Sequence, residues 1–447
     1  MKNNIVTRFP PSPTGLLHIG NVRTGLYNYF FALQNEGKFI FRIEDTDKER
    51  SKKEYEEDIF KSMEWLGLKY DGVTRQSERA GIHKKYLEKL LAEGKAYISK
   101  EEPKEEGQRT EVIRFKNPNT NITFTDLIRG EVSIDTTDLK DFVIAKSLDE
   151  PLYHLAVVVD DFEMGITHVI RGEDHISNTP RQILLLEAIG GSRPVYAHLP
   201  LIFAEDRSKL SKRKHGERVS LKHYIEQGYL PEAIINYMSL LGWNPGTDQE
   251  IFTFEELIKA FDISKVQKGG AIFNEEKLKW FNKEHMKRLP AEVLEQKMKE
   301  IITSVYKVSD NDIKHFTPVI LERISTFGEA RALIQQGEFD YLFKSPDYSI
   351  ELLYWKGQKD HEALIRRLNE VIKILGRIDE KDYKQAIIKD ALWEYATSEG
   401  RGEVLWPTRV ALSGKEKSPD PFVLAELLGK EESLKRLHSA LEKVSHA

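Results

Sequence analysis

The first third of the chain alternates between short apolar runs and stretches with the period of an amphipathic helix. Residues 5–9 form an apolar run that predicts a strand, and KFIFRIED at 38–45 predicts a second one. Between them, apolar side chains recur at helical spacing at Val22, Leu26, Tyr29, Phe30 and Leu33. A charged amphipathic helix is predicted over residues 53–66. This β-α-β-α order predicts a parallel sheet with crossover helices.

The pattern then changes twice. Residues 99–130 are polar and turn-rich with short strand-like pieces, which indicates a small insertion. Strand and helix patterns resume with PLYHLAVVV, ITHVIRG and the helix NTPRQILLLEAIG. From about residue 220 strands become scarce, and helical patterns such as EALIRRLNEVIKIL dominate to the end. We therefore predict a multidomain protein with an α/β half followed by an all-α C-terminal half.

Composition narrows the class of protein. The 447 residues allow roughly three domains of about 150 each, and 40% apolar with 31% charged residues is an ordinary soluble balance. The net charge of −5 neither suggests nor excludes a nucleic-acid partner. With no cysteine, disulfides, thiolate nucleophiles and cysteine-bound zinc are excluded. No apolar run approaches the roughly 20 residues that span a membrane, and we expect a soluble cytoplasmic protein with no membrane partner.

The stretch PPSPTGLLHIGN, residues 10–21, places an imidazole where the first helix is predicted to begin. Free backbone N–H groups and the positive end of the helix dipole favour phosphate at such a position. His18 would donate a hydrogen bond to a phosphate oxygen, and Gly20 would let a flat base approach the backbone. The alternative is a proline-rich loop that only caps the helix. Neither a Walker-type P-loop nor GxGxxG follows the strand, so other residues must complete a phosphate site.

The segment RSKLSKRKHG, residues 207–216, is the candidate to complete it. Its cations include Lys209, Lys212, Arg213 and Lys214, and it follows the last α/β element. A lysine-rich loop at the rim that holds His18 would close over a triphosphate and neutralise charge on departing pyrophosphate. The alternative is a solvated charge run. Taken together, the two segments predict nucleotide activation at the α-phosphate.

These residues resemble a known family. PSPTGLLHIGN and KLSKR are similar to the HIGH and KMSKS motifs of class I aminoacyl-tRNA synthetases, and RIEDTD with VVVDDFEMGITHVIRGEDHISNTPRQ resembles bacterial-type glutamyl-tRNA synthetases. The resemblance implies ATP-dependent activation of glutamate to glutamyl-adenylate, then transfer to the 3′-terminal ribose of tRNA(Glu), with tRNA usually bound before the first step. It also implies a Rossmann-type catalytic domain at 1–98 and 131–219, a shortened acceptor-binding insertion at 99–130, a stem-contact helical domain at 220–289 and an anticodon-binding domain at 290–447.

The resemblance also implies roles for individual residues. The catalytic group would be His18, Lys209 and Lys212. The ATP-binding residues would be His18, Gly20, Asn21, Asp174 and Lys212. The glutamate-binding residues would be Arg8, Ser12, Glu44, Tyr153 and Arg171. Asn21 stands where the motif has its second histidine and can donate a hydrogen bond but carry no charge. Val157 stands where some members carry an asparagine, so one polar contact is absent.

Metal content is a second departure from many bacterial members, which fold a zinc knuckle in the insertion. Ser99 and Glu101 stand roughly where the first cysteine pair would fall, and the segment is short. We therefore predict no structural zinc. Magnesium is expected as part of the ATP substrate.

Three other functions are alternatives to glutamyl-tRNA synthesis. A short paralogue that glutamylates a queuosine base on tRNA shares the catalytic half but lacks a C-terminal domain such as 290–447. Glutaminyl-tRNA synthetase has a C-terminal half of β-barrels and normally another residue at Ser12. A non-catalytic tRNA-binding protein would be expected to carry damaged motifs. Trp406, Arg401 and Arg409 are candidates for stacking on anticodon bases, and a monomer is the family expectation.

Overall fold

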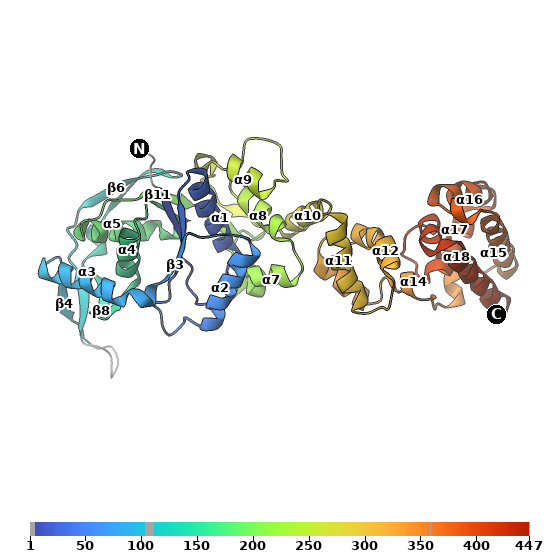
Figure 1. Cartoon of the computed structure of the whole chain (residues 1–447), viewed down its shortest axis with the longest axis horizontal. Helices are drawn as coiled ribbons and strands as arrows, with labels where there is room; N and C mark the ends of the chain where they lie inside the picture. The colour runs from blue at the N-terminus through green and yellow to red at the C-terminus, as the bar shows by residue number, and fades with distance from the viewer. Residues whose placement is uncertain (1–4, 103–110, 358, 447) are drawn as a thin grey trace. The chain divides into compact units, whose positions relative to one another are not determined.

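A computed structural model describes residues 5–102, 111–357 and 359–446, and it divides into two compact units (Figure 1). The first unit is Met1–Arg288 and the second is Leu289–Ala447. Within the described residues every strand belongs to the first unit. The predicted order, an α/β half followed by a helical half, is confirmed.

The first unit is built on a parallel sheet with the strand order β1-β2-β3. Strand β1 (Val6–Phe9) pairs with β2 (Lys38–Ile43), which pairs with β3 (Gly72–Arg75). Helix α1 (Ile19–Gln34) connects the first two strands and α2 (Lys53–Trp65) the next two. The apolar positions predicted for the first helix are mostly buried, so the strand-helix-strand-helix prediction is confirmed, with ends that differ by two residues at most.

A second parallel pair continues the fold. Strand β10 (His168–Gly172) pairs with β11 (Val195–Leu199), and α5 (Thr179–Ala188) lies between them in sequence. Thr167, the residue before β10, is hydrogen-bonded to β1, since its N–H donates to the Val6 carbonyl over 3.0 Å. The run LAVVV is helical and lies in α4 (Tyr153–Glu163). In the sequence alone, an apolar run of this length is compatible with a buried strand as well as with a buried helix.

Antiparallel strands occupy the part of this unit that precedes α4 in the chain. One sheet has the order β4-β5-β8-β9, and the hairpin of β6 and β7 joins β11 through the pair Tyr196↔Asp126. The bounds are β4 (Ala96–Lys100), β5 (Glu111–Phe115), β6 (Asn121–Asp126), β7 (Gly130–Asp135), β8 (Phe142–Ser147) and β9 (Glu150–Pro151), and α3 (Ala80–Ala92) precedes them. Part of the predicted insertion, residues 103–110, lies outside the described residues.

The end of the first unit is mainly helical and packs on α1. The ring of Tyr27 lies 4.9 Å from that of Phe261, and both belong to one apolar core with Trp243. The elements are β12 (Ile202–Phe203), α6 (Lys212–His215), α7 (Leu221–Glu226), α8 (Pro231–Leu240), α9 (Phe254–Ala260), β13 (Ala271–Ile272) and α10 (Glu275–Met286). Among the described residues after 220, β13 is the one strand, which agrees with the prediction that strands become scarce there.

Helices make up the second unit. They are α11 (Ala291–Thr303), α12 (Asp310–Glu322), α13 (Phe327–Gln335), α14 (Asp340–Phe343), α15 (His361–Gly376), α16 (Gln385–Glu399), α17 (Arg401–Ser413) and α18 (Pro421–Ser445). The Arg401 guanidinium lies 4.5 Å from the ring centre of Trp393, and that of Arg409 lies 4.8 Å from Trp406. The Trp406 indole N–H donates to the Leu352 carbonyl over 2.7 Å, which fixes that ring.

Candidate active site

The residues after β1, β10 and β11 line one cavity of about 350 Å³ beside the start of α1. The cavity brings together every predicted site residue except Lys212, namely Arg8, Ser12, His18, Gly20, Asn21, Glu44, Tyr153, Arg171, Asp174 and Lys209. Val157 also lines it. The carboxyl ends of strands in an open α/β sheet are where such folds bind ligands.

His18 is the N-cap of α1. Its Nδ1 accepts a hydrogen bond from the Gly20 N–H over 2.9 Å, so the proton of a neutral ring lies on Nε2. Burial, and then the nearby ammonium group of Lys212, lower the pKa of His18 to about 4. At neutral pH the ring is therefore an uncharged hydrogen-bond donor at the positive end of a helix.

Lys209 and Asp174 form an ion pair at the rim of the cavity. The Lys209 Nζ lies 3.1 Å from an Asp174 carboxylate oxygen, and both side chains are about half exposed. Burial alone would raise the pKa of Asp174, but the hydrogen bond from Lys209 lowers it overall. The pair places the Lys209 ammonium group at the side of the cavity where α1 begins.

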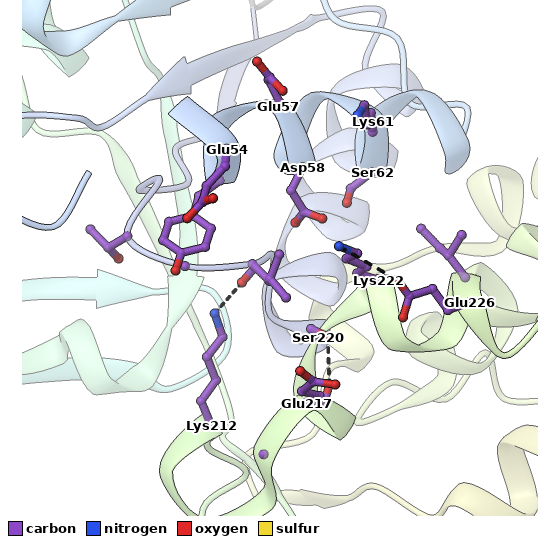
Figure 2. A pocket seen from close by; sticks show the side chains of 16 residues that line it. Glu54, Glu57, Asp58, Lys61, Ser62, Lys212, Glu217, Ser220, Lys222 and Glu226 are labelled. Atoms are coloured by element: carbon purple, nitrogen blue, oxygen red, sulfur yellow. Dashed lines mark hydrogen bonds and ion pairs between the residues drawn. The ribbon is translucent and has the colours of Figure 1, made fainter. Parts of the chain in front are cut away.

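Lys212 lies outside this cavity, although it is only three residues from Lys209. Its Nζ donates to the Leu16 carbonyl over 2.6 Å, and it lines a neighbouring cavity of about 870 Å³ together with Asp58 and Lys222 (Figure 2). Burial lowers the pKa of Lys212. The lysine-rich loop thus reaches the loop before α1, but Lys212 must break this hydrogen bond before its amino group can enter the cavity of His18.

A buried ion network lies behind Arg8 and Glu44, two residues that line the cavity. An Asp161 carboxylate oxygen lies 3.2 Å from Arg8 Nε and 2.7 Å from an Arg42 nitrogen, and Arg42 also lies 2.9 Å from Glu44. Burial alone would raise the pKa of Asp161, but the two arginines lower it overall. Burial raises the pKa of Glu44, against the effect of Arg42.

Sequence analysis missed two members of this network, Arg42 and Asp161. Both are charged residues next to long apolar runs, one within KFIFRIED and the other after LAVVV. Charged side chains inside such runs are rarely buried unless they are paired. That rule predicts that both side chains are paired if they are buried, but it does not predict that they pair with each other.

Arg171 is buried without a carboxylate partner. Its guanidinium donates to three uncharged side chains, His198 (3.2 Å), Gln182 (2.6 Å) and Thr179 (2.8 Å). Burial lowers its pKa. Arg8 and Arg42 are paired with Asp161 and Glu44, whereas Arg171 has only uncharged groups in direct hydrogen-bond contact.

Protonation of buried histidines should weaken folding in acid. Burial is the main cause that lowers the pKa of His18, His154, His175 and His285 from 6.5 to about 4. Between these two pH values the unfolded chain binds more protons, so the free energy of unfolding should fall as the pH is lowered. Each histidine adds up to about 1.4 kcal/mol per pH unit. Urea denaturation across this range measures the slope, which His285→Gln should reduce; a flat profile would contradict the assignment.

Two further findings concern metals and membranes. Over residues 5–102, 111–357 and 359–446 there is no group of three His, Cys, Asp or Glu side chains that could hold a metal ion. Glu101 accepts a hydrogen bond from Arg114 over 2.8 Å. None of the helices in the described part is both long and apolar enough to cross a membrane.

Comparison with known proteins identifies relatives along the whole chain. The model for tRNA synthetases class I (E and Q), catalytic domain, matches residues 4–108 and 99–280, and that for an anticodon binding domain matches 276–441. Glutamate–tRNA ligase 1 of Petrotoga mobilis is 41% identical over 98% of this chain and 97% of its own. Glutamate–tRNA ligase of Aquifex aeolicus is 40% identical over 99% of this chain and 100% of its own. A glutamate–tRNA ligase from Elizabethkingia meningosepticum, solved in complex with its amino acid, superposes with a TM-score of 0.87 at 34% identity over 98% of this chain and 99% of that one.

Proposed function

The chain belongs to the class I tRNA synthetases for glutamate and glutamine, and we propose that the cavity of His18 and Arg171 is where this glutamate–tRNA ligase activates glutamate. In the reaction an oxygen of the glutamate α-carboxylate attacks the α-phosphorus of ATP, and the bond to pyrophosphate breaks. The glutamyl group then passes from the adenylate to a hydroxyl of the terminal ribose of tRNA(Glu). ATP enters with Mg²⁺ as its substrate form.

His18, Lys209 and Lys212 act on the phosphates. The His18 Nε2–H donates to a phosphate oxygen, and Lys209 exchanges its contact with Asp174 for the charge that develops as pyrophosphate departs. Gly20 and Asn21 hold the nucleotide at the first turn of α1, and Asp174, which lines the same cavity, also binds it. Lys212 joins after releasing the Leu16 carbonyl.

The unpaired guanidinium of Arg171 is the observation that carries the glutamate side of the proposal. It is a buried cation in the cavity whose direct side-chain partners are all uncharged, so it can pair with a substrate carboxylate. Arg171 offers its guanidinium to one carboxylate, and Arg8 has a buried nitrogen without a hydrogen-bond partner for the other. Glu44 accepts the ammonium group, while Tyr153 and Ser12 line the pocket. Glutamine, which is neutral, would leave the positive charge unpaired.

ATP–pyrophosphate exchange tests this function. We expect exchange with glutamate, far less with glutamine, and a requirement for tRNA(Glu). Exchange without tRNA would favour the queuosine-modifying paralogue, and no exchange under any condition would favour a non-catalytic tRNA-binding protein. Charging of purified glutamate and glutamine tRNAs, side by side, then shows whether the enzyme discriminates between them.

We also propose that the enzyme needs no structural zinc. No cysteine is present to bind it, and Glu101 is engaged with Arg114. Elemental analysis of the purified protein should find far less than one zinc per chain. A zinc chelator should leave glutamate charging unchanged at saturating Mg²⁺, and stoichiometric zinc would contradict the proposal.

The remaining assignments concern tRNA. We propose that residues 99–130 bind the acceptor end, 220–289 the stem and 290–447 the anticodon, with Trp406, Arg401 and Arg409 as stacking candidates. Support comes from the family models, which place a catalytic domain before an anticodon binding domain. We also propose, from the family resemblance, that the enzyme is a monomer and that it works in the cytoplasm.

A further inference from the structure

A buried chain of polar side chains leads from the β6–β7 hairpin to Arg171. An Asp126 carboxylate oxygen lies 2.6 Å from His198 Nδ1, and Arg171 Nε lies 3.2 Å from His198 Nε2. The exposed fractions of Asp126, His198 and Arg171 are 2%, 0% and 6%. Asp126 and His198 lie on separate strands, β6 and β11, which meet beside them at the pair Tyr196↔Asp126.

Asp126 determines which nitrogen of His198 carries the proton. Burial alone would raise the pKa of Asp126, but the hydrogen bond from His198 and those from the Arg129 and Ile128 N–H groups lower it overall, so the side chain is a charged acceptor. Burial lowers the pKa of His198, which keeps the ring neutral. The single ring proton therefore lies on Nδ1, and Nε2 is left as an acceptor for Arg171.

This acceptor holds Arg171 in one orientation. His198 accepts a hydrogen bond from the Arg171 Nε–H, while Gln182 and Thr179 each accept one from a terminal nitrogen of the guanidinium. None of these partners neutralises the guanidinium, so its charge stays available to an anion in the cavity. A long side chain fixed in this way loses less conformational freedom when a ligand binds.

The turn that carries Asp126 is anchored a second time. Arg129 donates to the His198 carbonyl over 3.3 Å and to the Lys268 carbonyl over 2.7 Å, and it pairs with Glu173, which follows β10. The turn is thus attached to the ends of both β10 and β11. Its position relative to His198 is set by two independent groups of hydrogen bonds.

We propose that Asp126 and His198 are positioning residues for amino-acid recognition, which select the imidazole tautomer that holds the Arg171 guanidinium toward the substrate carboxylate. The proposal rests on the assignment of Arg171 to glutamate in the proposed function. The proposal gives the β6–β7 hairpin a role in glutamate affinity, although neither Asp126 nor His198 lines the cavity.

Asp126→Asn tests the tautomer directly. The asparagine oxygen can keep the hydrogen bonds from the Ile128 and Arg129 N–H groups, while its NH₂ group takes the place of the oxygen that accepts from the His198 backbone N–H over 3.0 Å and lies 2.6 Å from Nδ1. Facing Nδ1, the NH₂ group moves the ring proton to Nε2, where the proton opposes the Arg171 N–H. We expect the KM for glutamate to rise about 10-fold to 100-fold, with the KM for ATP and the kcat at saturating glutamate little changed. NMR of labelled histidine should show His198 protonated on Nδ1 in the wild type and on Nε2 in the variant.

Variants of His198 separate positioning from folding. His198→Gln places an oxygen near the Nε2 position and should restore much of the affinity, whereas His198→Leu should not. His285, a buried imidazole 3.0 Å from Asn236, provides the control, because His285→Leu should lower Tm without raising the KM for glutamate.

Two results would overturn the proposal. One is that Asp126→Asn and His198→Leu raise the KM for glutamate and ATP alike, or lower only Tm. The other is that the tautomer of His198 does not change in Asp126→Asn. If Arg171→Ala itself leaves glutamate affinity intact, the proposed function fails; if Arg171→Ala weakens it and the Asp126 and His198 variants do not, only the positioning role fails.

Discussion

Replacing His18 with asparagine should slow glutamate-dependent ATP–pyrophosphate exchange by about 100-fold to 1,000-fold while the fold is retained. Asparagine is a preferred N-cap, and its side-chain oxygen can accept the Gly20 N–H that His18 Nδ1 accepts over 2.9 Å. The variant lacks the Nε2–H that would donate to phosphate. Because the wild-type ring is neutral, with a pKa of about 4, the lost interaction is a hydrogen bond and not a charge.

His18→Ala is the matched variant, because it removes both the donor and the cap. Its exchange rate should fall by the same factor as that of His18→Asn, and its free energy of unfolding should be lower by about 1 kcal/mol. The KM for glutamate should stay unchanged in both. If His18→Asn works within a few-fold of the wild type and only His18→Ala is impaired, the imidazole serves the helix and not the phosphate.

Replacing Arg171 with alanine should lower kcat/KM for glutamate by about 100-fold to 1,000-fold, because a buried carboxylate then loses its charged partner. The same change removes the unpaired positive charge of the network, so the preference for glutamate over glutamine should shrink. Steady-state exchange with each amino acid measures both effects.

Arg171→Lys provides the comparison. It keeps the charge but lacks the planar fork that donates to His198, Gln182 and Thr179 at once. We expect it to retain the preference for glutamate but with a raised KM. An Arg171→Ala enzyme that still prefers glutamate as strongly as the wild type would show that the charge lies elsewhere.

Local features of the site were predictable from the sequence because their cause lies within a few residues. The N-cap at His18 involves a partner two residues away, and the apolar spacing of the following helix determines which side of it is buried. The α/β order and the cationic loop were also predictable, because both follow from residues that are close together in the sequence. The roles proposed for Arg8, Glu44 and Arg171 come from the family resemblance, because in isolation these residues look like ordinary charged positions.

Ionic partners were not predictable, because each pair joins distant parts of the chain. Asp161 meets Arg8 across 153 residues and Arg42 across 119, and His198 meets Asp126 across 72. Charge alone does not say which buried acid balances which buried base. The packing of α4 on the sheet determines the first pairs, and the contact between β6 and β11 determines the last.

The two lysines of KLSKR show that side-chain partners are not predictable even for residues only three positions apart. The sequence determined that a cationic loop follows the last α/β element, because composition and order are local properties of the chain. Only the tertiary structure decided that Lys209 faces Asp174 and the cavity while Lys212 binds the Leu16 carbonyl in a neighbouring one. Side-chain direction in a loop depends on which distant hydrogen-bond acceptors the fold brings within reach, and no pattern in the sequence carries that information.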